Sequence, residues 1–135
     1  MKVVLISLLF CAQAQALTLE IIGKRGASLL KTNQQISLPT NVGQVSFQIL
    51  QENKIPFHGG SYGFDSIFNL GQDIKAISDV EMKAYGWCFS IDGFVPETMA
   101  DKTPMPDTNS SIIWFYAYAH YKDGRWIAQC HKDDF

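Results

Sequence analysis

The sequence predicts an α+β domain that is small and mostly β, with one main helix and a C-terminal β-hairpin. Three observations carry this prediction. Short apolar or alternating segments are separated by glycines, prolines and Asp-Gly pairs, a pattern typical of strands and turns. Residues 42–52 have apolar side chains at helical spacing. Finally, Asp123-Gly124 lies between the last two strand-like segments, where it favours a tight turn.

The N-terminus has the features of a cleavable signal peptide. Lys2 is followed by the apolar run of residues 3–12 and by Ala14-Gln15-Ala16, a small-x-small pattern of the kind that precedes cleavage. We therefore expect residues 1–16 to be removed and the mature chain, residues 17–135, to be secreted or periplasmic. Its 119 residues suit one domain with a single hydrophobic core. No later segment approaches the ~20 apolar residues that a membrane-spanning helix needs.

Charge and cysteine content limit the partners of this domain. Without Lys2, ten basic residues stand against thirteen acidic ones, which gives a formal charge of −3. Nucleic acid and anionic membranes attract dense basic patches, and the sequence has none, so we expect neither as a partner. Cys11 belongs to the predicted signal peptide. Cys88 and Cys130 then remain in an oxidising compartment, and we expect them to form a disulfide.

Turn residues divide the chain before its last hairpin. Two strands are expected before the helix, over residues 17–22 and 29–38. Pro39 ends the second strand, and Thr40 and Asn41 offer an N-cap to the helix over residues 42–52. Residues 53–63 are expected to form an irregular, turn-rich connection. The remaining expected elements are strands over residues 64–70, 73–77 and 85–91, a tight turn at Asp92-Gly93, and an irregular excursion over residues 94–111.

The C-terminal hairpin places many aromatic residues on one face of a sheet. Its strands cover residues 112–121 and 125–130, and counting outward from the turn pairs Tyr121 with Trp126, Ala119 with Ala128 and Ala117 with Cys130. Alternation then gives the opposite face to Trp114, Tyr116, Tyr118 and His120. If Cys88 meets Cys130, the same alternation places Trp87, Phe89 and Ile91 with this aromatic set. The aromatic face is either hydrophobic core, the usual place for such rings, or an exposed platform.

Four short motifs connect the chain to a known family. They are Tyr62-Gly63-Phe64-Asp65-Ser66-Ile67, Gly86-Trp87-Cys88-Phe89-Ser90-Ile91-Asp92-Gly93, Met99-Ala100-Asp101-Lys102 and Ile112-Ile113-Trp114-Phe115-Tyr116. With them the chain resembles the DUF4430 family, which is related to the C-terminal β-domain of transcobalamin. The resemblance covers nearly the whole mature chain and implies a β-grasp-like mixed sheet crossed by one helix.

The same resemblance implies a ligand. In the cobalamin carriers the related domain caps the upper face of the corrin ring, so Trp87 and Phe89 become expected ligand contacts. Trp114, Tyr116 and Tyr118 join them as candidates because they share the aromatic face. No cofactor is required on this interpretation, and cobalamin is a candidate ligand.

Catalytic and metal sites are not expected. Cys88 with His120 or His131 could form a nucleophilic pair, but a disulfide is the better interpretation in an exported chain. Asp133 and Asp134 could join the histidines around a metal, but their place near the end of the chain is typical of a solvated tail.

We therefore expect an exported, non-enzymatic binding module whose ligand is a corrinoid or another apolar small molecule. The alternative is a structural domain that docks to an extracellular or periplasmic protein and has no small-molecule ligand.

Overall fold

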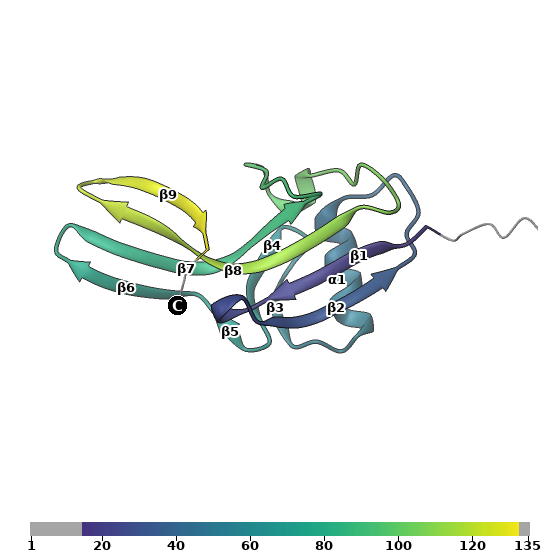
Figure 1. Ribbon diagram of the computed structural model, residues 1–135, viewed down its shortest axis with the longest axis horizontal. Helices are drawn as coiled ribbons and strands as arrows, with labels where there is room; N and C mark the ends of the chain where they lie inside the picture. Colours follow the sequence, from purple (N-terminus) through teal and green to yellow (C-terminus); the bar gives the residue numbers. More distant parts are fainter. Residues whose placement is uncertain (1–14, 133–135) are drawn as a thin grey trace, which may run out of the picture.

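The computed structural model describes residues 15–132, and Figure 1 shows a long curved sheet with one helix against part of it. Residues 1–14, which include most of the predicted signal peptide and Cys11, lie outside the described residues, as do residues 133–135 with Asp133 and Asp134. Within the described part, no helix is long and apolar enough to span a membrane.

The main sheet confirms the predicted α+β, mostly-β fold. Its strands are β1 (Leu17–Ile22), β2 (Ser28–Gln34), β6 (Asp73–Ser78), β7 (Glu81–Ile91), β8 (Ser111–Lys122) and β9 (Arg125–His131). They follow the order β2-β1-β8-β7-β6, and β9 pairs with the part of β8 that β1 does not reach. β1 runs parallel to β8, whereas the other pairs in this sheet are antiparallel. The result is a β-grasp-like mixed sheet with a C-terminal hairpin.

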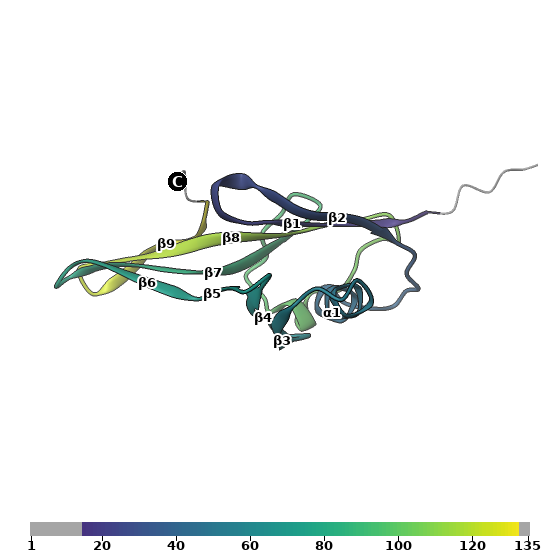
Figure 2. The same cartoon turned by 90° about the horizontal axis from the view of Figure 1, so that it is seen from below.

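The helix α1 (Val42–Glu52) has the bounds that the sequence predicts. Of the two cap candidates, Asn41 caps the helix, because its side-chain oxygen accepts a hydrogen bond from the Gln44 N–H at 2.8 Å. The apolar stripe that includes Val45 and Ile49 is buried against the sheet. Figure 2 shows the two layers edge-on, with α1 on one side of the main sheet.

A second, three-stranded sheet lies in the helical layer and corrects the prediction of an irregular connection over residues 53–63. Its strands are β3 (Phe57–Gly60), β4 (Gly63–Ile67) and β5 (Leu70–Gly71). β3 was expected to be irregular, but Phe57 packs edge-on against Phe47 and Phe64, and Gly59 adopts a φ of 135°. A Cβ on Gly59 would lie 2.4 Å from the Gly63 carbonyl oxygen, so this close approach needs glycine.

Three other strands differ from the predictions by more than one residue. β2 ends at Gln34, not at residue 38, because Gln34 pairs with Leu17, the first residue of its partner β1. The strand expected over residues 64–70 is divided into β4 and β5 by Phe68 and Asn69, which both have positive φ. β7 begins at Glu81, four residues before the predicted start, because it pairs there with β6 and β8.

The four strands farthest from α1 project as what we call the distal arm. It consists of β6, residues 81–85 of β7, residues 118–122 of β8, and β9, and it extends beyond the helical layer in Figures 1 and 2. Both predicted Asp-Gly turns form, since Asp92, Gly93, Asp123 and Gly124 all have positive φ.

The register of the C-terminal hairpin is only partly as predicted. Tyr121 pairs with Trp126, but Ala128 pairs with His120, not with Ala119, and Tyr118 pairs with His131. The expected pairing of Ala117 with Cys130 is therefore wrong. The register shifts on both sides of His120, as in a β-bulge, and each shift changes which residues lie opposite one another.

The predicted disulfide is present. Cys88 and Cys130 are joined with a Cα–Cα distance of 5.8 Å. The bond ties the end of β9 to the middle of β7, which otherwise lies on the far side of β8.

Candidate functional site: an aromatic row with two openings

Six rings share one face of β7 and β8. Residues directly opposite in an antiparallel pair lie on the same face, and the opposite pairs are Tyr85 with Tyr118, Trp87 with Tyr116, and Phe89 with Trp114. This confirms that Trp87 and Phe89 lie with the predicted aromatic set. We call these six residues the aromatic row. Neighbouring ring centroids within it lie 5.1–6.0 Å apart.

The inner end of the row is hydrophobic core. Trp114 is 2% exposed, and its Nε1–H donates a hydrogen bond to the buried Ser46 hydroxyl oxygen of α1 at 2.9 Å. Phe64 of β4 packs against the same indole at a centroid distance of 4.7 Å. The helix and the small sheet therefore fix this ring in place.

The middle of the row is held by β5. The Trp87 Nε1–H donates to the Leu70 carbonyl oxygen at 2.7 Å, and the Tyr116 hydroxyl donates to the Gly71 carbonyl oxygen at 2.8 Å. Burial raises the pKa of Tyr116, and the negative charge of Asp73 raises that pKa further. Tyr116 therefore stays a neutral hydrogen-bond donor at physiological pH.

One opening, which we call the edge groove, lies along β7. β6 pairs with β7 only as far as Tyr85, and beyond it the next pairing on that side is the bridge from Ile91 to Phe94. Within the described residues, this stretch of β7 edge pairs with no further strand. A groove of about 340 Å³ lies there, and Trp87, Phe89 and Trp114 are among the residues that line it.

The rim of the edge groove carries exposed apolar side chains beside the exposed acidic residues Asp65 and Glu97. Tyr62, Val95 and Met99 line it and are 46%, 41% and 55% exposed. The backbone N–H of Ala100, in the 3-10 turn η2 (Ala100–Lys102), donates to the Tyr62 carbonyl oxygen at 3.3 Å. This bond ties the segment after β7 to the turn between β3 and β4, so the two sides of the rim are held together.

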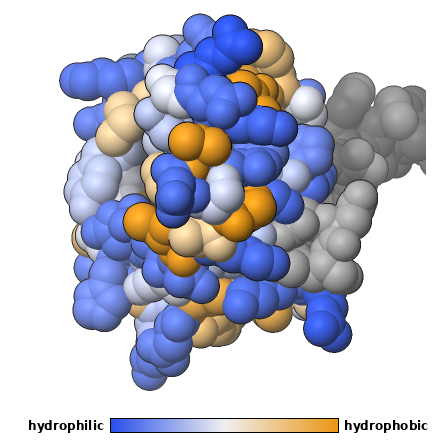
Figure 3. All heavy atoms as spheres, turned by 90° about the vertical axis from the view of Figure 1, so that its left-hand side faces the viewer, coloured by the Kyte–Doolittle hydropathy of each residue, from blue (hydrophilic) through white to orange (hydrophobic). Residues whose placement is uncertain are grey.

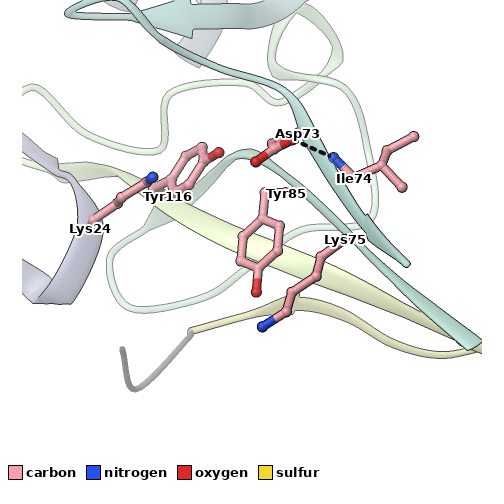
Figure 4. A pocket seen from close by; sticks show the side chains of 6 residues that line it. All are labelled: Lys24, Asp73, Ile74, Lys75, Tyr85 and Tyr116. Carbon is pink, nitrogen blue, oxygen red and sulfur yellow. Dashed lines mark hydrogen bonds between the residues drawn. The ribbon is translucent and has the colours of Figure 1, made fainter. Parts of the chain in front are cut away.

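The second opening, which we call the basin, lies toward the distal arm. It has a volume of about 240 Å³ and is lined by Lys24, Asp73, Ile74, Lys75, Tyr85 and Tyr116. Figure 4 shows Lys24 beside the Tyr116 ring and Lys75 beside the Tyr85 ring, each from a different element. None of the lining residues of the basin also lines the edge groove.

The five predicted ligand contacts divide between these places. Trp87, Phe89 and Trp114 line the edge groove, and Tyr116 lines the basin. Tyr118 lies farther out on the arm, half-buried, with the Lys83 Nζ 4.4 Å from its ring centroid. Trp87 is also half-buried, whereas Phe89, Trp114 and Tyr116 are less than 10% exposed.

Sequence reasoning missed several residues at both openings. Tyr85 could have been found, because it lies two residues before Trp87 in the same strand and so on the same face. Lys24 and Lys75 had no such signal, since only the fold brings these two elements together. The rim residues Val95 and Met99 belong to the predicted irregular excursion, whose path the sequence does not specify.

The described residues offer no group of three or more His, Cys, Asp or Glu side chains that could hold a metal ion. His120 instead pairs with Glu81, with His120 Nε2 2.7 Å from Glu81 Oε1. Cys88 is bonded to Cys130 and so carries no free thiol that could act as a nucleophile.

Comparison with protein-family models and with curated proteins gave no match. The expected relation to the DUF4430 family therefore stays a prediction. Among solved structures, a candidate metal-binding protein from Ruminococcus gnavus is 19% identical and aligns with a TM-score of 0.49, over 82% of this chain and 99% of that chain. At this level the similarity indicates neither a common function nor a common site.

Proposed function

We propose that the protein is an exported, non-enzymatic binding module that holds a flat apolar small molecule in the edge groove. One observation carries this proposal: the aromatic residues Trp87, Phe89 and Trp114 and several exposed apolar rim residues line a single groove at an open sheet edge. Ligand sites are typically concave and mostly apolar, with few polar groups. The disulfide is in keeping with an oxidising compartment, as expected for an exported protein.

The size of the groove limits how a ligand fits. Its 340 Å³ is near the lower end of the roughly 300–1,000 Å³ found for ligand pockets. A planar molecule of a few fused rings would fit inside it. A corrinoid, the ligand class that the DUF4430 resemblance implies, would enter with one edge of its ring and leave the rest outside.

Titration of the oxidised protein with a corrinoid tests this proposal. We would use dicyanocobinamide as the probe and follow heat and tryptophan fluorescence. Met99→Lys places a charge among the exposed apolar rim residues and should weaken binding at least fivefold, whereas Leu38→Lys, at another exposed apolar position in the loop before α1, should not. Absence of saturable binding for a dissociation constant up to about 1 mM would contradict the corrinoid proposal.

A second candidate function, protein docking, is supported by the distal arm. One face of the arm gathers apolar and aromatic side chains: Ile74, Ala76, Met82, Ala84, Ala119, Tyr121 and Trp126. Ile74 is 67% exposed and Trp126 is 47% exposed. Figure 3, which looks at the arm end-on, shows apolar patches among hydrophilic side chains. Exposed apolar patches of this kind often mark protein interaction sites.

A second copy of the chain is the simplest partner for this face, because an apolar surface without charges is complementary to itself. Sedimentation equilibrium of the oxidised protein tests this candidate. A dimer that Trp126→Lys dissociates would support docking through the arm. A monomer at several hundred micromolar would contradict self-association.

A further inference from the structure

We propose that the basin is a second binding site, and that its ligand is a carboxylate attached to one or two aromatic rings. In this site Lys24 and Lys75 supply the positive charge that attracts the carboxylate, and Tyr85 and Tyr116 contact the ring. The basin and the edge groove have no lining residue in common, so this inference does not depend on the corrinoid proposal.

The two tyrosines give the basin a rigid aromatic wall. Tyr85 is 9% exposed and Tyr116 is 5% exposed, so the surrounding structure determines where their rings lie. Their planes are within 21° of each other, with centroids 6.0 Å apart. The bond from the Tyr116 hydroxyl to the Gly71 carbonyl oxygen fixes one ring further. A wall that is already ordered costs little conformational entropy when a flat ligand packs against it.

The charges of the basin favour an anion. Lys24 belongs to the 3-10 turn η1 (Lys24–Gly26) and Lys75 to β6, and both side chains are exposed. In the part of the chain that the structure describes, neither lysine has a carboxylate within 4.0 Å. Lys24 instead lies over Tyr116, with its Nζ 6.0 Å from the ring centroid.

Asp73 is the acidic residue in the lining of the basin, and one of its carboxylate oxygens already accepts a hydrogen bond. Its carboxylate accepts a hydrogen bond from the Ile74 backbone N–H at 2.9 Å, the contact drawn in Figure 4. Two lysines against one aspartate leave the basin with a formal charge of +1. A singly charged anion would neutralise it.

The volume of the basin limits the size of the ligand. At about 240 Å³ the basin is below the roughly 300–1,000 Å³ of pockets for drug-sized molecules. A single ring or a fused pair would fill it. A small inorganic anion would leave the tyrosine wall uncovered, and an uncharged ring would leave both ammonium groups unpaired.

Titration of the oxidised full chain with 2-naphthoate tests the proposal. Two matched probes separate the contribution of the carboxylate charge from that of the aromatic rings. The probe 2-naphthamide has the rings without the charge, and acetate has the charge without the rings. Binding would be followed by heat and by the NMR resonances of the tyrosine rings. We expect saturable binding of 2-naphthoate and at least tenfold weaker binding of the other two probes.

Charge-neutral variants test the role of the lysines. Lys24→Gln and Lys75→Gln should each weaken 2-naphthoate binding at least threefold, because each removes one of the two positive charges of the basin. Lys31→Gln, an exposed lysine of β2 that is not in the basin, should have no effect. Equal affinity for 2-naphthamide, equal affinity for acetate, no response to the two basin variants, or no saturable binding at all would each overturn the proposal.

Discussion

The hydrogen bond between Trp114 and Ser46 joins the largest buried side chain of the sheet to the helix. We predict that Ser46→Ala lowers the free energy of unfolding by about 1–3 kcal/mol, because the buried indole N–H loses its acceptor. Urea denaturation measures the change. Ser37→Ala, at an exposed position before α1, is the control and should change stability little. A loss no larger than that of the control would contradict this role of Ser46.

Tyr116 should make the fold sensitive to alkaline pH. Its pKa is raised in the folded state by burial and by Asp73, so the unfolded chain loses this proton first as the pH rises. The stabilisation is complete below the unfolded pKa of about 10 and is lost as the pH rises from there through the folded pKa. Stability measured across this range should fall less steeply in Tyr116→Phe than in the unaltered chain.

At the residue scale the sequence predicted which rings share a face, because strand alternation depends only on spacing along the chain. It could not predict how deeply each ring is buried. Trp114 is covered by α1 and Trp87 contacts β5, whereas Tyr118 lies on the arm beyond both. The burial of each ring therefore depends on tertiary contacts between segments that are far apart in the sequence.

At the scale of the elements, Gly43 sets the distance between α1 and the turn before β4. A Cβ added to Gly43 would lie 1.6 Å from the Ser61 carbonyl oxygen, so the helix or the turn would have to move. We predict that Gly43→Ala destabilises the fold by at least ~2 kcal/mol. Gln44→Ala, at the next and exposed helix position, should be nearly neutral. Urea denaturation of the two variants compares them directly, and equal stability would show that the helix is not held at this point.

The contrast between α1 and β3 shows what local sequence can predict about elements. The helix has both a capping residue and an apolar stripe, and its bounds were predicted correctly. β3 depends on a glycine-permitted close approach and on ring contacts from α1 and β4, and none of these is local. The predicted register of the C-terminal hairpin was wrong because no sequence pattern reliably predicts a β-bulge.

At the scale of the whole molecule, the disulfide joins the distal arm to the rest of the sheet. Cys88 and Cys130 are 42 residues apart, and closing a loop of this length stabilises a fold by roughly 4 kcal/mol in the chain-entropy model. We predict a loss of this order for the double variant Cys88→Ser with Cys130→Ser, measured by denaturation against the oxidised chain. A loss below about 1 kcal/mol would indicate that the arm packs equally well without the bond.

On the proposed function, the edge groove, and not the arm, binds an apolar ligand. The most direct measurement is to map backbone and side-chain NMR shifts of the oxidised protein during titration with dicyanocobinamide. We predict saturable shifts that concentrate at Trp87, Val95 and Met99, with the arm residues Trp126 and Ile74 unchanged. Shifts that are confined to the arm, or the absence of saturable shifts, would contradict binding in the edge groove.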